Sequence, residues 1–447
     1  MLQNHMTQKA VSIMTLGCRV NQYESDSVAS KLKENNIKIV PFGEKCDIAV
    51  INTCTVTSES DKKSRQMIHR ALLFADHVVV TGCYAQISGD EESKNSSVTY
   101  FRGNSGKAGL ADTVMNILAG INEPKVDIGN PDNISAVESI LETPMRTRSY
   151  IKIEDGCNNS CSYCLIHTAR GPVRSKSPET VLKEAEILST KGNAEIILTG
   201  IETASYGLDF QNRRPYGYHL ADLITAINKI ESVKRIGIAS LDPSVFTDYF
   251  TETVAKAEKL LPHFHISLQS GSSRILASMK RKYNRDMALK SFERIKKNIP
   301  DATFSADIIV GYPGETDEDF DDTLSICEQI QFLHLHIFPY SKRIGTPAAE
   351  MKDQIPAQIK KERLKRLSEL GLASKEKILD DYVKSHTESP VFVLVEKADA
   401  KSYKGHSEHF AEVIAENAGE RPKVGDIVPT VLTHYDEKYV YGIRKMP

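Results

Sequence analysis

The chain has 447 residues, of which 40% are hydrophobic and 26% are charged. At roughly 150 residues per domain, this length predicts about three folded domains. The composition is that of an ordinary globular protein and excludes intrinsic disorder and a fibrous repeat. The 57 Lys and Arg residues balance 59 Asp and Glu residues, and the net charge of −2 excludes a basic surface over the whole molecule. Any surface for nucleic acid must therefore be a local basic face.

The start of the chain is polar, and no apolar run approaches the roughly 18 residues that a membrane helix needs. We therefore expect a cytoplasmic protein with no membrane partner. The chain has eight cysteines, too few for a disulfide scaffold of this length. In a reducing compartment, cysteines that occur in groups are typical of metal ligands or catalysts.

The first region, residues 1–128, alternates β-rich runs with helical patterns such as residues 58–74. Its β-rich runs lie at 11–16, 47–52 and 77–81. This alternation predicts a parallel α/β sheet with helices on both faces. Residues 129–148 have no clear period and are expected to form a linker.

The second region, residues 149–385, repeats the same alternation and ends in a charged amphipathic helix at 355–384. Its β-rich runs lie at 150–153, 195–199, 235–240, 263–268, 304–310 and 333–338. Six βα repeats suit a full or partial (βα)6 barrel better than a small open sheet. Chemistry in such barrels gathers at the C-terminal ends of the strands.

The last region, residues 386–447, has β-rich runs without long helices. These runs lie at 391–395, 409–414, 427–432 and 439–443. The pattern predicts a small closed β-barrel, an architecture that often holds oligonucleotides.

Three cysteines stand close together in Cys157-Asn-Asn-Ser-Cys161-Ser-Tyr-Cys164, directly after a predicted strand. Three thiolates at this spacing can hold three irons of a 4Fe-4S cluster and leave one iron open for a ligand. The alternative is structural zinc, with His167 completing a Cys3His set on one crowded loop.

Cys18, Cys54 and Cys83 are far apart in sequence, but each follows the end of a predicted strand and has Gly, Asn or Thr beside it. In a parallel sheet these three loops lie along one edge, where doubly wound sheets bind ligands. We therefore expect the three thiols to converge on a metal. The alternative is three unrelated buried cysteines, which is the role we expect for Cys46 and Cys327.

These motifs resemble a known family. The spacing Cys157-x3-Cys161-x2-Cys164, with an aromatic residue before the last cysteine, resembles the radical S-adenosylmethionine (radical SAM) signature. The N-terminal cysteine set before that core, and the β-barrel tail after it, make essentially the whole chain similar to the methylthiotransferase family. Leu16-Gly-Cys-Arg-Val-Asn21 and Asn52-Thr-Cys-Thr-Val-Thr57 most resemble the branch that acts on threonylcarbamoyladenosine in tRNA.

The resemblance implies a methylthio transfer to an unactivated aromatic carbon, which ordinary acid–base side chains cannot achieve. It implies two 4Fe-4S clusters, one on Cys157, Cys161 and Cys164 and one on Cys18, Cys54 and Cys83. The first would bind S-adenosylmethionine at its open iron for radical formation, and the second would hold the sulfur to be methylated and transferred. The implied partners are the anticodon stem-loop of tRNA, a reducing electron donor and a sulfur source, but not DNA. The tail resembles the family's RNA-binding TRAM domain.

The expected cofactor contacts lie in the cysteine loop or just after predicted barrel strands, on the rim that also holds Cys157. They are Tyr163, Thr199, Gly200, Ser240, Gln269 and Gly311. Basic residues follow the cysteine loop at Arg170, Arg174 and Lys176, and residues 274–297 hold nine Lys or Arg against two acids. They would attract phosphates, although a solvated helix face is the alternative for a basic stretch.

The branch resemblance predicts that the substrate is N6-threonylcarbamoyladenosine beside the anticodon, with the methylthio group placed on C2. Its carboxylate and hydroxyl require polar or cationic partners, and Arg19 and Arg170 are the candidates for the carboxylate because Arg can make two parallel hydrogen bonds to it. The alternative for each arginine is a surface or phosphate contact. The alternative substrates are isopentenyladenosine in tRNA and a protein side chain. The alternative from another class is a non-catalytic RNA-binding protein with structural metal.

Overall fold

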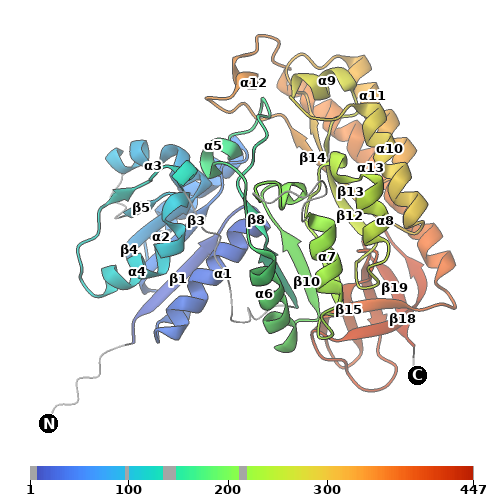
Figure 1. The fold of residues 1–447 in the computed structure, drawn as a ribbon, viewed down its shortest axis with the longest axis horizontal. Coiled ribbons are helices and arrows are strands. Elements are labelled where there is room, and N and C mark those ends of the chain that lie inside the picture. The colour runs from blue at the N-terminus through green and yellow to red at the C-terminus, as the bar shows by residue number, and fades with distance from the viewer. Residues whose placement is uncertain (1–7, 96–99, 134–146, 211–218, 446–447) are drawn as a thin grey trace.

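The structure is a computed structural model that describes residues 8–95, 100–133, 147–210 and 219–445. Figure 1 shows an N-terminal sheet domain (blue to cyan), a central domain (green to orange) and a small C-terminal barrel (red) at one end of the central domain. Within these described ranges, no helix combines the length and the apolar character needed to cross a membrane. Most of the predicted linker, residues 134–146, lies outside the described residues.

The N-terminal domain is a six-stranded sheet in the order β2-β1-β3-β4-β5-β6, and every neighbouring pair is parallel. Its strands are β1 (Ala10–Thr15), β2 (Lys38–Val40), β3 (Cys46–Thr53), β4 (Ala75–Gly82), β5 (Tyr100–Arg102) and β6 (Val126–Asp127). Its helices are α1 (Arg19–Glu34), α2 (Ser58–Ala71), α3 (Cys83–Asn95) and α4 (Leu110–Leu118), with a 3-10 turn η1 at Asn104–Gly109. One apolar cluster packs α2 and α3 against the sheet and a second packs α1 and α4 against it, which confirms helices on both faces.

The central domain consists of two parallel three-stranded sheets, β11-β10-β7 and β12-β13-β14, that a parallel bridge between Leu241 and Ile266 connects. Its strands are β7 (Arg148–Lys152), β10 (Glu195–Thr199), β11 (Arg235–Ile238), β12 (His263–Gln269), β13 (Thr303–Val310) and β14 (His334–Pro339). Since β7 and β14 do not pair, the predicted (βα)6 barrel is partial and open on one side.

Helices cover the outside of the partial barrel and bury one continuous apolar core with the outward side chains of its strands. They are α6 (Pro178–Thr190), α7 (Leu220–Asn228), α8 (Asp248–Val254), α9 (Ser273–Ser278), α10 (Arg285–Asn298) and α11 (Asp317–Ile330). Shorter elements at the C-terminal rim are β8 (Glu154–Asp155), α5 (Ile166–Arg170), β9 (Arg174–Ser175), η3 (Thr203–Ser205), η4 (Pro243–Val245) and α12 (Pro347–Glu350), while η2 (Pro131–Asn133) precedes the domain.

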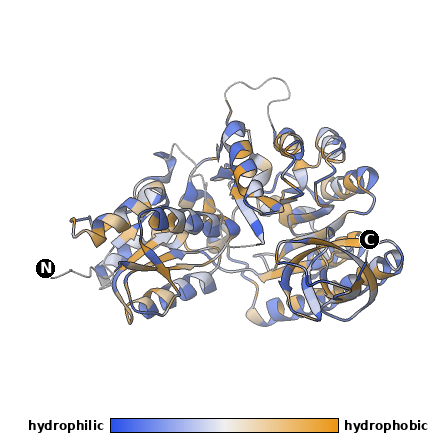
Figure 2. Cartoon of the chain, turned by 90° about the horizontal axis from the view of Figure 1, so that it is seen from below, coloured by the Kyte–Doolittle hydropathy of each residue, from blue (hydrophilic) through white to orange (hydrophobic). Residues whose placement is uncertain are grey.

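The long helix α13 (Ala357–Ser385) leads into a closed barrel in the order β15-β16-β17-β19-β18, which confirms the predicted architecture of the tail. Its strands are β15 (Val391–Ala398), β16 (Ser402–His406), β17 (Glu412–Glu416), β18 (Ile427–Tyr435) and β19 (Val440–Arg444). Figure 2 shows this barrel nearly end-on. Strand β16 was not predicted, because it is mostly polar and contains Gly405; a Cβ at Gly405 would lie 1.8 Å from the carbonyl oxygen of Leu394.

Candidate functional site

The loop between β8 and α5 carries Cys157, Cys161 and Cys164, just beyond the first barrel strand. The backbone N–H of Asn159 points at the Cys157 sulfur (3.4 Å), and the backbone N–H of Ile166 points at the Cys164 sulfur (3.4 Å). Burial raises the pKa of Cys157 to about 12 and that of Cys164 to about 11. Without a metal these groups are therefore thiols, and a bound cluster must displace their protons.

The geometry of this loop does not suit a single zinc ion. His167 is exposed on α5, and nowhere in the described ranges do three His, Cys, Asp or Glu side chains come close enough to hold one ion. Three thiols on one loop do suit a four-iron cluster, because such a cluster binds each cysteine through a different iron.

A buried arginine contacts this cysteine loop. The Arg281 Nη1 donates to the Cys161 sulfur at 3.4 Å, while Nη2 donates to the Asp242 carboxylate. The sequence places Arg281 in a basic stretch expected to attract phosphates, but its side chain is only 5% exposed and faces the cluster site. In the same stretch, Arg274 and Arg294 pair with Asp319 and Asp248 of their own domain.

The other three cysteines lie at one edge of the N-terminal sheet. Cys18 immediately precedes α1, Cys54 follows β3, and Cys83 begins α3. Gly17 has φ +90°, and a Cβ there would lie 2.7 Å from the Cys54 sulfur. Gly82 has φ +98°, and a Cβ there would lie 2.3 Å from a backbone oxygen of β3. The glycines before Cys18 and Cys83 therefore let these two loops pack closely against the end of β3, which Cys54 follows.

These three thiols interact electrostatically. The negative charge of an ionised Cys83 raises the pKa of both Cys18 and Cys54. Burial raises the pKa of Cys54 to about 11. Cys83 also raises the pKa of Cys164, which belongs to the other set. Helix α5, which follows Cys164, packs against α3, which begins at Cys83, so the two sets of cysteines lie on the two sides of the junction between the N-terminal and central domains.

Arg170 stands at this junction and is fully buried. Its Nε donates to the Cys83 sulfur at 3.3 Å, its Nη1 donates to Glu24 at 2.6 Å and to Asp155 at 3.0 Å, and its Nη2 donates to Asn21 at 2.6 Å. The prediction that Arg170 binds a substrate carboxylate is wrong, because protein carboxylates already occupy its guanidinium.

Arg174 and Lys176, predicted with Arg170 as phosphate-attracting residues, are also buried. Lys176 pairs with Glu184 at 2.7 Å, and Arg174 donates to the backbone oxygens of Pro172 and Arg170. The sequence shows that these residues are basic but not that the two domains enclose them.

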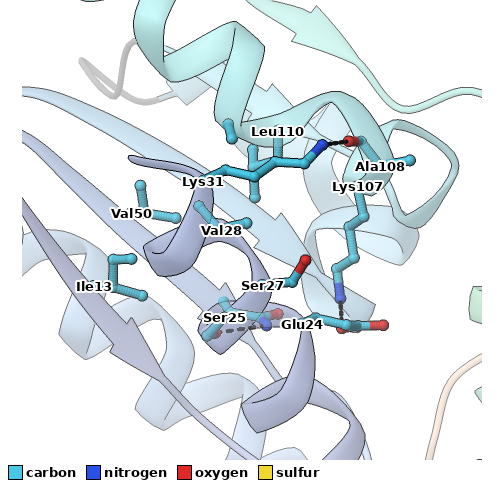
Figure 3. A pocket seen from close by; sticks show the side chains of 12 residues that line it. Ile13, Glu24, Ser25, Ser27, Val28, Lys31, Val50, Lys107, Ala108 and Leu110 are labelled. Atoms are coloured by element: carbon cyan, nitrogen blue, oxygen red, sulfur yellow. Dashed lines mark hydrogen bonds and ion pairs between the residues drawn. The ribbon is translucent and has the colours of Figure 1, made fainter. Parts of the chain in front are cut away.

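Glu24 is the centre of a buried ion network between the two domains. Burial alone would raise its pKa, but Arg170, Lys107 and Lys152 together hold that pKa well below its usual range. Figure 3 shows Lys107 reaching Glu24 at the end of a small cavity of about 120 Å³ between α1 and α4. Apolar side chains such as Ile13, Val28 and Leu110 line the rest of this cavity, which contains none of the predicted site residues.

A much larger chamber, of about 710 Å³, lies inside the partial barrel. Residues of all three domains line it: Gly17, Cys18 and Arg19 of the N-terminal domain, inward side chains of β10 to β14, and His406, Phe410 and Glu412 of the C-terminal barrel. Of the expected cofactor contacts, Thr199, Gly200 and Ser240 line this chamber.

The other three expected contacts lie elsewhere on the rim. Tyr163 packs in an apolar cluster with Tyr312 and Tyr340, beside the cysteine loop. Gln269 is buried at the end of β12 with φ +63°. Gly311 has φ +70° and donates its N–H to the Glu315 carboxylate at 2.6 Å.

A wall of histidines inside the chamber was not predicted. His263 and His265 on β12 and His334 and His336 on β14 all line it, together with Asp307 on β13. The signal was present in the runs His263-Phe-His265 and His334-Leu-His336, because alternate residues of a strand share a face. Which face points inward depends on the closure of the barrel, and the sequence does not show it.

Comparisons with known proteins agree with this architecture. Residues 151–327 match the radical SAM superfamily, and residues 10–103 match the family described as Uncharacterized protein family UPF0004. The chain is 36% identical over 431 residues to the threonylcarbamoyladenosine tRNA methylthiotransferase MtaB of Bacillus subtilis (strain 168), covering 94% of this chain and 92% of the relative. It is 33% identical over 395 residues to the tRNA-2-methylthio-N(6)-dimethylallyladenosine synthase of Moorella thermoacetica (strain ATCC 39073 / JCM 9320), covering 86% and 88%.

Among solved structures, the radical S-adenosylmethionine methyltransferase TsrM of Kitasatospora setae has a TM-score of 0.57 at 15% identity, covering 76% of this chain and 77% of that one. At this identity the likeness concerns the fold alone. The fold and the matched domains define a radical SAM enzyme with an additional N-terminal α/β domain. The chain belongs to the radical SAM family of tRNA methylthiotransferases.

Proposed function

We propose that this enzyme transfers a methylthio group to C2 of N6-threonylcarbamoyladenosine beside the anticodon of tRNA. One observation carries the proposal: Cys18 of one cysteine set lines a chamber formed by residues of all three domains, and Arg170, on the helix that follows the other set, contacts the sulfur of Cys83. The similarity to the MtaB relatives favours threonylcarbamoyladenosine over isopentenyladenosine, over a protein side chain and over a non-catalytic role.

Each set of cysteines fits an iron–sulfur cluster. Cys157, Cys161 and Cys164 would hold one 4Fe-4S cluster with S-adenosylmethionine, and Cys18, Cys54 and Cys83 would hold the second. When bound, these groups supply the one-electron chemistry and the sulfur that side chains lack. Thr199, Gly200 and Ser240, with Tyr163, Gln269 and Gly311 on the same rim, are the proposed contacts to S-adenosylmethionine.

The protein's own residues position these groups. Arg170 and Arg281 each donate an N–H to a cysteine sulfur, and such hydrogen bonds stabilise the negative charge of a ligating thiolate. Gly200 allows close backbone approach at the rim, since a Cβ there would lie 2.0 Å from the Glu154 carboxylate. Cys54 and Cys83 are buried, whereas Cys18 is exposed and Cys157, Cys161 and Cys164 are partly exposed, which leaves each site open on one side to a ligand.

The chamber suits a nucleotide that is turned out of its RNA loop. Its volume of about 710 Å³ lies in the usual range for small-molecule sites, roughly 300–1,000 Å³. Phe338 lines it and is 42% exposed, which leaves an aromatic face free to stack on a base. The C-terminal barrel closes one end of the chamber and is the proposed contact for the rest of the stem-loop.

The test uses reconstituted enzyme with a reductant, a sulfide source and S-adenosylmethionine. It compares tRNAs that carry threonylcarbamoyladenosine, isopentenyladenosine or unmodified adenosine at the same position. Mass spectrometry of the digested nucleosides should show methylthio product from the first tRNA alone. Equal turnover on all three, or turnover only on isopentenylated tRNA, would contradict the proposal. In this assay a small reductant and sulfide replace the cellular electron donor and the cellular sulfur source, which are the remaining proposed partners. We propose a cytoplasmic location, with no membrane or DNA partner.

A further inference from the structure

Arg19 differs from the other arginines near the cysteine sites. It lies next to Cys18 on the chamber wall and is partly exposed, with its guanidinium 5.8 Å from the centroid of the Tyr150 ring. Within the part of the chain that the structure describes, no carboxylate forms an ion pair with it. Arg170 and Arg281, by contrast, are buried and paired with carboxylates.

The carboxylates of the chamber wall already have nitrogen partners. Glu195 pairs with Arg148 at 2.6 Å and with Arg235 at 3.4 Å, and Glu412 pairs with Lys404 at 2.8 Å. Asp307 lies 3.1 Å from the Nε2 of His265. Arg19 is thus a positive charge on this wall that no carboxylate of the described residues neutralises, and such a charge favours an anionic ligand.

Two histidines add hydrogen-bonding groups further along the same wall. The rings of His265 and His336 lie 5.3 Å apart, at an angle of 62°. Nε2 of His265 faces the Asp307 carboxylate and donates to it, which leaves Nδ1 of the ring for a ligand. Burial lowers the pKa of His336 and lowers that of His334 to about 4, so both rings are neutral at pH 7.

We propose that Arg19 pairs with the carboxylate of the N6-threonylcarbamoyl group, and that His265 and His336 bind its hydroxyl and carbamoyl atoms. This inference rests on the proposed function and names the residues that recognise the substrate of the enzyme. The group has an anionic end and both donors and acceptors in its middle, which match the charge of Arg19 and the ring nitrogens of the two histidines. An isopentenyl group has no polar atom and would leave Arg19 without an anionic partner in the chamber.

The experiment uses the reconstituted full-length enzyme and two anticodon stem-loop RNAs. One RNA carries N6-threonylcarbamoyladenosine, and the other carries the same nucleoside with its carboxylate converted to a carboxamide. The wild-type kcat/KM, from the yield of methylthio product, should favour the carboxylate by roughly 10- to 100-fold. In Arg19→Gln that ratio should fall to within about twofold of one, and Arg19→Lys should retain part of it.

The control is Arg65→Gln. Arg65 also lies 5.8 Å from a tyrosine ring centroid, that of Tyr84, but it is on α2 and outside the chamber. This variant should keep the wild-type ratio. His336→Phe should raise KM for the natural RNA about fivefold while leaving the carboxylate preference in place, because it removes polar contacts and no charge.

Iron content, the electron paramagnetic resonance spectrum and S-adenosylmethionine cleavage without RNA are measured on every variant, because Arg19 adjoins Cys18. Wild-type enzyme that modifies both RNAs equally, or Arg19→Gln that keeps the wild-type preference, would overturn the inference. If Arg19→Gln loses its second cluster, the inference is tested instead by the wild-type preference for the carboxylate RNA over the carboxamide RNA and by the KM of His336→Phe. Wild-type enzyme that modifies neither RNA but acts on isopentenylated RNA would instead refute the proposed function.

Discussion

Cys157, Cys161 and Cys164 share one short loop, whereas Cys18, Cys54 and Cys83 come from three loops of a six-stranded parallel sheet. The first set needs only its loop and the rim of the barrel. The second set exists only when β1, β3 and β4 are in register, because each cysteine follows its own strand. The site of Cys157, Cys161 and Cys164 is therefore formed by residues close in sequence, whereas the site of Cys18, Cys54 and Cys83 is formed only by the pairing of the strands in the sheet.

The arginines that contact the two sites differ in the same way. Arg281 belongs to the domain that carries its cysteine partner, and its carboxylate partner Asp242 is in that domain too. Arg170 belongs to the central domain but contacts Cys83, Glu24 and Asn21 of the N-terminal domain. The second site therefore depends on the docking of two domains, and the first does not.

The largest expected effect separates the two sites by function. Cys161→Ala should abolish reductive cleavage of S-adenosylmethionine, since three thiols are needed to hold the first cluster. Cys54→Ala should leave cleavage running and stop methylthio product formation. Chromatography of the cleavage products and mass spectrometry of tRNA nucleosides measure the two activities. A Cys54→Ala enzyme with wild-type product yield would show that the second site is misassigned.

Removing the charge of Arg170 tests the dependence on domain docking. Arg170→Leu leaves Glu24 and Asp155 buried without their main partner, which should lower the free energy of unfolding by about 3–5 kcal/mol. The matched control is Arg294→Leu, because Arg294 pairs with Asp248 at 2.9 Å on the surface; it should cost less than about 1 kcal/mol. Urea denaturation of both variants gives the difference. Equal values would mean that the buried network does not hold the domains together.

A pH titration tests the other junction, where Arg148 of β7 pairs with Glu396 of β15 at 2.5 Å. Burial opposes ionisation of Glu396, but His406 and Arg148 lower its pKa to about 2. The stabilisation is therefore present above the ordinary glutamate pKa, near 4.5, and is lost as the pH falls toward 2, by about 2–3 kcal/mol. Glu396→Gln should flatten this part of the stability profile, and an unchanged profile would contradict the assignment.

The smallest effect is expected at a cysteine outside both sites. Cys46 is 4% exposed in the apolar core beneath α2. Cys46→Ala should cost about 1 kcal/mol of stability and leave iron content and both activities at wild-type levels. Iron analysis with thermal denaturation checks this, and a lower iron content would place Cys46 among the ligands.

The sequence by itself determined the elements that carry a strong period. The long strands β3, β10 and β13 and the helices α6 and α13 were predicted because alternation and amphipathic spacing extend over many residues. Strands β2 and β5 have only three residues each, too few to show a period, and β16 is mostly polar and contains Gly405. The cysteine spacing likewise predicted the first site directly, and the second through the parallel sheet.

Tertiary structure alone decided which polar groups face one another. Arg170 and Arg19 both lie close to a cysteine motif, and the sequence predicts the same role for both. Only the docking of α5 against the N-terminal domain buries Arg170 among carboxylates, whereas Arg19 faces the chamber. The inward direction of His265 and His336 likewise follows from closure of the barrel. Periodicity is a local property of the chain, whereas burial and ion pairing depend on contacts between segments far apart in sequence.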